Sequence, residues 1–115
     1  MTVTIWHNPR CSKSRMTLGL LEERGIEPNI VTYLDTPPTT DQLNEVLGLL
    51  GRTPRELMRK GEAEYKEQGL ENSDLTDAQL VEAMVATPKL IERPVVLANG
   101  KAAVGRPPES VLDIL

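Results

Sequence analysis

The 115-residue sequence contains one cysteine, one histidine and no phenylalanine. A single cysteine rules out a disulfide within the chain, so this is no secreted scaffold held by disulfides, and we expect a reducing, cytoplasmic environment. Aromatic residues make up only 3% of the chain, so the hydrophobic core must consist of aliphatic side chains. One histidine and one cysteine cannot form a metal-ligand set unaided, and we therefore expect no metal site.

Long apolar runs and an excess of positive charge are also missing. No stretch reaches the roughly 20 apolar residues of a transmembrane helix, and the N-terminal run 1–6 is too short for a signal peptide. A formal net charge of −4 gives the chain as a whole no net positive charge with which to attract nucleic acid or an anionic membrane. The glycine-rich nucleotide motifs are absent. We therefore expect no membrane partner, no nucleic-acid partner and no tightly bound cofactor.

The first third of the chain predicts a β-α-β unit. A short β-branched strand at 3–6 is broken by Asn8-Pro9, a helix follows at 12–24, and Gly25 ends it. A second β-branched run covers 29–33. Two strands joined by a helix of that length are expected to pair in parallel.

The middle of the chain predicts helices, and the end returns to strands. Three capping boxes mark helix starts at Thr39–Gln42, Thr53–Glu56 and Thr76–Gln79. The polar stretch 62–73 is expected to be a frayed helix and loop. Near the end, Asn99-Gly100 is typical of a type I′ hairpin between two short strands, and a final helix should begin at Pro108.

This order of elements is that of an α/β, thioredoxin-like fold: β-α-β, then an α-helical insertion at about 39–90, then β-β-α. The chain is long enough for one core, and no linker or repeat marks a boundary. We therefore expect a single domain, 1–115, with the insertion packed against the sheet, and a monomer.

Cys11 is the candidate nucleophile because it directly precedes a predicted helix. The free backbone N–H groups and the dipole at a helix N-terminus favour an anion. Residues 1–21 carry Arg10, Lys13 and Arg15 but no carboxylate, and we expect Arg10 and Arg15 to lower the pKa of the thiol further. The alternative, a buried Cys11 acting as a small hydrophobe, fits its polar neighbours poorly.

Two neighbours of Cys11 have open roles. His7 is either a hydrogen-bonding or electrostatic partner of the sulfur or a turn residue that ends the first strand. Ser14 stands where a dithiol oxidoreductase carries its second cysteine. Any disulfide turnover must therefore borrow an external thiol.

Four segments, taken together and in this order, resemble the glutaredoxin-coupled arsenate reductases. They are His7-Asn8-Pro9-Arg10-Cys11-Ser12-Lys13-Ser14-Arg15, Leu57-Met58-Arg59-Lys60, Ile91-Glu92-Arg93-Pro94-Val95-Val96 and Gly105-Arg106-Pro107-Pro108-Glu109. Arg10, the Ser12-Lys13 pair and the short tail differ from the family's common pattern. They point to a compact, arsenate-reductase-like subgroup.

The resemblance implies a thioredoxin-like fold and reduction of arsenate to arsenite, an activity of arsenical resistance. It implies a covalent thiol–arsenate adduct on Cys11, which glutathione attacks as co-substrate and reductant, and a mixed disulfide that glutaredoxin resolves. It also implies that His7 assists ionisation of Cys11 and that Pro94 is the cis-proline facing the site.

The resemblance further implies that Arg59, Arg93 and Arg106 form the oxyanion site. Arginine suits that role because its planar guanidinium donates bidentate hydrogen bonds and stays charged at any working pH. The other basic residues are assigned to the surface: Lys13, Arg24, Arg52 and Arg55.

Two other functions stay open on the sequence. One is a monothiol reductase of glutathione mixed disulfides. The other is a non-enzymatic regulator that binds RNA polymerase, as the Spx proteins of the same fold do, although Ser14 removes the Cys-x-x-Cys switch that those proteins usually carry.

Overall fold

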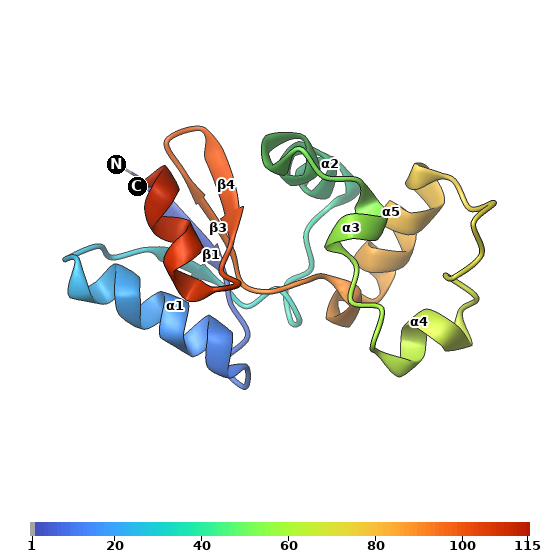
Figure 1. Ribbon diagram of the computed structural model, residues 1–115, viewed down its shortest axis with the longest axis horizontal. Coiled ribbons are helices and arrows are strands. Elements are labelled where there is room, and N and C mark those ends of the chain that lie inside the picture. Colours follow the sequence, from blue (N-terminus) through green and yellow to red (C-terminus); the bar gives the residue numbers. More distant parts are fainter. Residues whose placement is uncertain (1) are drawn as a thin grey trace. The chain divides into compact units, whose positions relative to one another are not determined.

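The computed structural model describes residues 2–115, so that Met1 of the predicted domain and of the N-terminal run lies outside the described residues. The chain forms two compact units (Figure 1). The first unit combines the residues up to Thr36 with Arg93–Leu115, and the second is Pro37–Glu92. The helical insertion predicted at about 39–90 falls within the second unit. That both units work as a single domain stays a prediction.

The first unit is built on a four-stranded mixed sheet in the order β2-β1-β3-β4. Its strands are β1 (Val3–Trp6), β2 (Asn29–Val31), β3 (Val95–Ala98) and β4 (Lys101–Val104). β1 and β2 pair in parallel, as predicted, with Ile5 opposite Ile30. β3 pairs antiparallel with both β1 and β4, which brings the end of the chain beside its beginning.

Helix α1 (Ser12–Glu23) and the C-terminal helical segment η2 (Pro108–Ile114) lie against the sheet in the first unit (Figure 1). Their apolar side chains form one core with the strands, and its buried members are Val3, Ile5, Leu21, Val96, Ala98, Val111 and Ile114. No aromatic ring is among them, but Trp6 and Tyr33 are buried elsewhere in the first unit. The expectation that the core consists of aliphatic side chains alone was therefore wrong, because even scarce aromatic rings lose contact with water when they are buried. The final helix begins at Pro108 as expected but winds as a 3-10 helix, a form common in short segments.

The hairpin between β3 and β4 turns at Asn99-Gly100, as predicted. Both residues have positive φ, 55° and 72°, which is what a type I′ turn requires. The Asn99 side chain also donates from Nδ2 to the carbonyl oxygen of Ile114 at 2.8 Å. The turn therefore also holds the end of η2.

The second unit is helical. It contains α2 (Thr40–Leu50), α3 (Pro54–Leu57), α4 (Ala63–Glu67), α5 (Asp77–Ala86) and the 3-10 segment η1 (Pro88–Leu90). All three predicted capping boxes form, on Thr39, Thr53 and Thr76. Its buried core is again aliphatic and includes Leu43, Leu47, Leu57, Leu80, Met84 and Leu90.

Arg55 corrects one of the surface assignments. Its guanidinium donates to Tyr65 Oη at 2.9 Å, to the carbonyl oxygen of Leu70 at 2.7 Å and to that of Asn72 at 3.0 Å. These bonds hold the polar stretch after α4 in place. Arg24 and Arg52 are exposed, as predicted.

Within residues 2–115, every helix is too short or too polar to cross a membrane.

Candidate active site around Cys11

Cys11 occupies the N-cap position of α1. Asn8 shapes the turn that leads to it: its carbonyl oxygen accepts from the backbone N–H of Cys11 at 3.0 Å, and its Oδ1 accepts from that of Arg10 at 3.0 Å. The backbone of Cys11 is extended, with φ −94° and ψ 124°, and no side-chain hydrogen bond caps the helix. The free backbone N–H groups in the first turn of α1 can therefore donate to the sulfur of Cys11.

The pKa of the Cys11 thiol lies below its ordinary value. Burial raises this pKa, but the backbone amides of Ser14 and Lys13 and the guanidinium groups of Arg93 and Arg106 outweigh burial and lower it. The expected lowering by a helix N-terminus is therefore present. A thiolate at this position is stabilised at a pH where an ordinary cysteine is protonated.

Arg10 and Arg15 do not have the effect on Cys11 that their spacing suggests. Neither is among the groups that lower the pKa of Cys11. Arg15 instead donates from Nη1 to the carbonyl oxygen of Pro9 at 2.9 Å and helps to lower the pKa of His7. Proximity in sequence was misleading here because a long side chain at a helix start can turn away from the sulfur.

Cys11 is buried, with 8% of its surface exposed. Burial agrees with the alternative of a small hydrophobe, but the surroundings do not. Nη2 of Arg106 lies 3.7 Å from Cys11 Sγ, within hydrogen-bonding range of a sulfur. A guanidinium beside a thiol favours the ionised form.

Arg93 and Arg106 meet at this site although thirteen residues separate them. Arg106 donates from Nε to the carbonyl oxygen of Arg93 at 2.9 Å. Both residues precede a cis-proline, because the Arg93–Pro94 and Arg106–Pro107 peptide bonds are cis. The first of these agrees with the expectation for Pro94. The β3–β4 hairpin carries both arginines to the start of α1.

His7 is buried at the end of β1 and pairs with Ser14. Its Nδ1 lies 2.6 Å from Ser14 Oγ, which also accepts the backbone N–H of Asn8 at 3.0 Å. Burial, followed by the charge of Arg15, lowers the pKa of His7, so the ring is neutral at neutral pH. Nδ1 and Ser14 Oγ share one hydrogen bond, whose donor is set by the tautomer of the neutral ring. His7 thus reaches Cys11 through Ser14, whose backbone amide faces the sulfur.

Arg59 belongs to the second unit, where it lies after α3 and pairs with a carboxylate. Its Nη2 is 2.7 Å from Glu62 Oε1, and Lys89 shares Glu62 at 3.4 Å while reaching Glu64 at 3.2 Å. The backbone N–H of Arg59 donates to the carbonyl oxygen of Leu90 at 2.7 Å. The predicted meeting of Arg59 with Arg93 and Arg106 stays a prediction.

The described part of the chain holds no group of three or more histidine, cysteine, aspartate or glutamate side chains that could bind a metal ion. The chemistry available at Cys11 is that of a thiolate next to cationic donors. Such a site can attack an electrophilic centre in an anion.

A protein-family comparison matches residues 6–114 to the ArsC family model. The chain belongs to the ArsC family. The match spans both units, so the helical insertion belongs to the family's architecture.

Individual relatives agree with the ArsC assignment. An arsenate reductase of Neisseria meningitidis serogroup B is 52% identical over 114 residues, covering 98% of this chain and 97% of the relative. YfgD, an uncharacterised protein of Escherichia coli K12, is 56% identical over 98% of this chain and 96% of its own. The solved arsenate reductase of Vibrio cholerae superposes with a TM-score of 0.98 at 52% identity, covering 100% of this chain and 98% of that one.

These comparisons confirm three predictions made from the sequence: the resemblance to arsenate reductases, the α/β thioredoxin-like fold, and an oxidoreductase of the arsenate reductase class. The roles of the individual residues stay predictions.

Sequence reasoning missed several parts of the site in this ArsC protein. Lys13 was assigned to the surface, yet its backbone amide helps to stabilise the thiolate. Asn8 was treated only as a strand breaker, whereas it organises the turn before Cys11. Position at a helix start could have indicated Lys13, since the first free amides belong to the residues after the N-cap.

Proposed function

We propose that this ArsC-family protein reduces arsenate to arsenite with Cys11 as the nucleophile. The observation that carries the proposal is the 3.7 Å approach of Arg106 Nη2 to Cys11 Sγ, because one guanidinium can then stabilise the thiolate and bind the incoming oxyanion. The arsenate reductase relatives support the same substrate.

In the first step, the Cys11 thiolate attacks arsenic(V). A sulfur–arsenic bond forms and an arsenic–oxygen bond of the dihydrogen arsenate ion breaks; the leaving hydroxyl takes the proton of the second arsenate hydroxyl and departs as water. Arg93 and Arg106 bind the remaining oxygens, and Arg59 is the third proposed ligand of the oxyanion. Arginine fits these tasks because its charge persists at every working pH and its donors match a tetrahedral oxyanion.

In the second step, the thiolate of glutathione attacks the Cys11 sulfur of the adduct. A disulfide forms between glutathione and Cys11, the sulfur–arsenic electron pair stays on arsenic, and arsenite leaves. A glutaredoxin thiol then takes up the glutathione and frees Cys11. An external thiol is required because the chain has only one cysteine, and this chemistry needs no bound cofactor.

His7 and Ser14 hold the site ready for this chemistry. The hydroxyl of Ser14 links the buried ring of His7 to the turn at Asn8, which fixes the first turn of α1. His7 is thus a positioning residue that assists the ionisation of Cys11 through Ser14. We further propose that the protein acts as a cytoplasmic monomer and as a single domain.

The test is a coupled assay that supplies arsenate, glutathione and glutaredoxin. Arsenate-dependent oxidation of glutathione is expected from the native chain. Turnover of a glutathionylated substrate but not of arsenate would instead support the monothiol reductase and contradict the proposal.

The role of Arg59 has its own matched pair of variants. Arg59→Ala is expected to raise KM for arsenate about tenfold, as loss of one charged hydrogen-bond donor does. Glu62→Gln, which removes the carboxylate but keeps Arg59, is the control and should not raise KM. An unchanged KM in Arg59→Ala would remove this residue from the oxyanion site.

A further inference from the structure

Gly105, directly before Arg106, is packed more tightly than any other glycine in residues 2–115. A Cβ at this position would lie 2.5 Å from Thr17 Oγ1, 2.8 Å from Pro94 Cγ and 3.2 Å from Pro94 Cδ. All three residues are buried. The other glycines of the described chain have nothing within 4 Å of the same atom. Gly105 therefore serves a close approach between backbone and neighbours.

Both neighbours of Gly105 in this contact are fixed. The hydroxyl of Thr17 donates to the carbonyl oxygen of Lys13 at 2.8 Å, so it belongs to the first turns of α1. The carbonyl oxygen of Pro94 accepts the backbone N–H of Gly105 at 2.9 Å. Neither can yield easily, because one is tied to the helix and the other is a buried ring.

The same backbone segment carries the guanidinium of Arg106. Arg106 donates from its backbone N–H to the carbonyl oxygen of Val104 at 2.9 Å and from Nε to that of Arg93 at 2.9 Å. Its Nη2 then reaches Cys11 Sγ. A displacement of Gly105 away from Thr17 and Pro94 would carry Arg106 with it and change the distance from Arg106 Nη2 to Cys11 Sγ.

We propose that Gly105 is a positioning residue that sets the distance between the Arg106 guanidinium and the Cys11 sulfur. Because Gly105 has no side chain, the end of β4 packs closely against α1 and Pro94. This close packing brings the guanidinium of Arg106 to the thiol of Cys11. The consequence for arsenate binding rests on the function proposed above, whereas the consequence for the thiol does not.

Gly105→Ala is the direct test, with Gly19→Ala as the matched control. Gly19 lies in α1 of the same unit, and a Cβ there meets nothing within 4 Å. Two quantities are measured on each folded variant: the thiol pKa, from the pH dependence of iodoacetamide alkylation of Cys11, and KM for arsenate in the coupled assay.

In Gly105→Ala we expect a higher thiol pKa, an alkylation rate at pH 7 lower by roughly threefold, and a KM for arsenate higher by about tenfold, since small displacements of a positioned group are costly. Gly19→Ala should match the native protein in both. Adding Thr17→Ala to Gly105→Ala removes the nearest atom and should recover part of both losses.

A second pair of variants covers the case in which Gly105→Ala does not fold. Thr17→Val replaces the hydroxyl that faces Gly105 with a larger methyl group and so crowds Gly105 from the side of α1. Thr17→Ala loses the same hydrogen bond but leaves space beside Gly105. Only Thr17→Val should raise the thiol pKa. A native thiol pKa in both Gly105→Ala and Thr17→Val would overturn the inference. If the native protein lacks arsenate turnover, the proposed function fails while the alkylation data still decide the role of Gly105.

Discussion

The helix start at Cys11 differs from those of α2, α3 and α5 in the second unit in how its free backbone amides are used. Helices α2, α3 and α5 each begin with a complete capping box, in which a threonine hydroxyl and a glutamine or glutamate side chain satisfy these groups. Helix α1 begins with Cys11 and has no side-chain cap. Its amides and nearby arginines instead stabilise a thiolate.

This difference shows how one structural element serves two purposes. A capping box contributes stability, typically about 1 kcal/mol, and leaves nothing for a ligand. An N-terminus capped by a thiolate gives up that contribution when the thiol is protonated and offers a reactive anion when it is not. Helix α4 also lacks a side-chain cap, but only α1 has a thiol at its N-cap, and we propose that the chemistry takes place there.

The largest expected effect comes from Cys11→Ser, which makes the start of α1 similar to those of the second unit. Arsenate-dependent glutathione oxidation should fall by more than about 1000-fold, because a serine hydroxyl stays protonated and is a weak nucleophile. Stability should be unchanged or higher by up to about 1 kcal/mol, since serine is a favoured N-cap. The coupled assay and urea unfolding measure the two. An active Cys11→Ser protein would refute the mechanism.

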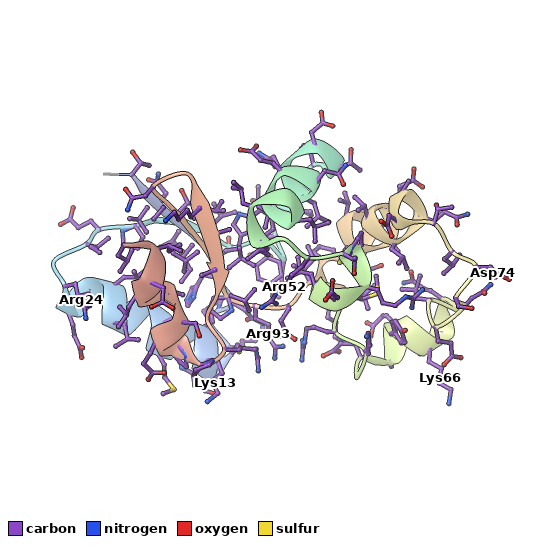
Figure 2. The ribbon with its side chains drawn as sticks, turned by 45° about the horizontal axis from the view of Figure 1, so that its top comes forward. Lys13, Arg24, Arg52, Lys66, Asp74 and Arg93 are labelled. Atoms are coloured by element: carbon purple, nitrogen blue, oxygen red, sulfur yellow. The ribbon has the colours of Figure 1, made fainter. Side chains whose placement is uncertain are left out.

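The next largest effect is expected from Arg106→Ala. Removing a charged hydrogen-bond donor costs about 1.5–3 kcal/mol, which corresponds to a KM for arsenate higher by roughly 10- to 100-fold, and the thiol pKa should rise. Arg24→Ala is the matched control, because Arg24 is exposed and Figure 2 labels it at the opposite end of α1 from Lys13. Equal KM values in the two variants would argue against an oxyanion role for Arg106.

A smaller effect is expected when a capping box is removed. Thr76→Ala should lower the free energy of unfolding by about 1 kcal/mol, because the backbone N–H of Gln79 loses its acceptor at 3.2 Å. Thr76→Ser keeps the hydroxyl and should stay close to the native protein. Arsenate turnover at saturating substrate should be native in both. Loss of turnover in a folded Thr76→Ala protein would mean that the cap has more than a stabilising role.

The smallest effect is the pH dependence of stability that Cys11 confers. Its pKa is lower in the folded protein than its ordinary value, so folding favours the thiolate. This contribution is fully present above the ordinary thiol pKa and is lost as the pH falls through the lowered one. As the pH increases from the lowered pKa to the ordinary one, the free energy of unfolding of the native protein should rise relative to that of Cys11→Ser. Parallel curves would show that the thiolate adds nothing.

Local signals predicted most of the fold. The three capping boxes, the Asn99-Gly100 turn and the parallel β1–β2 pair all depend on neighbouring residues or on one short connection. The form of the C-terminal segment could not be predicted, because a 3-10 and an α-helix share the same start signal at Pro108. Arg55 was missed because its three acceptors lie 10 to 17 residues further along the chain.

The candidate site was predicted in part. The position of Cys11 before a helix indicated its thiolate character. The expectation that Arg10 and Arg15 lower its pKa was wrong, whereas Arg93 and Arg106, which the resemblance implies for the oxyanion site, do lower it. Arg10 and Arg15 are near in sequence, whereas Arg106 is 95 residues away and yet reaches the sulfur. Sequence spacing predicts contacts along a helix and not across a sheet.

The sequence by itself determined the identity of the nucleophile, the need for an external thiol and the order of the elements, because a single cysteine and local capping and turn signals leave few alternatives. Only the tertiary structure decided which cations face Cys11, how His7 reaches it through Ser14, and why residue 105 has no side chain. Those features depend on distances between segments that antiparallel pairing of β3 with β1 and β4 brings together, and no local pattern encodes such distances.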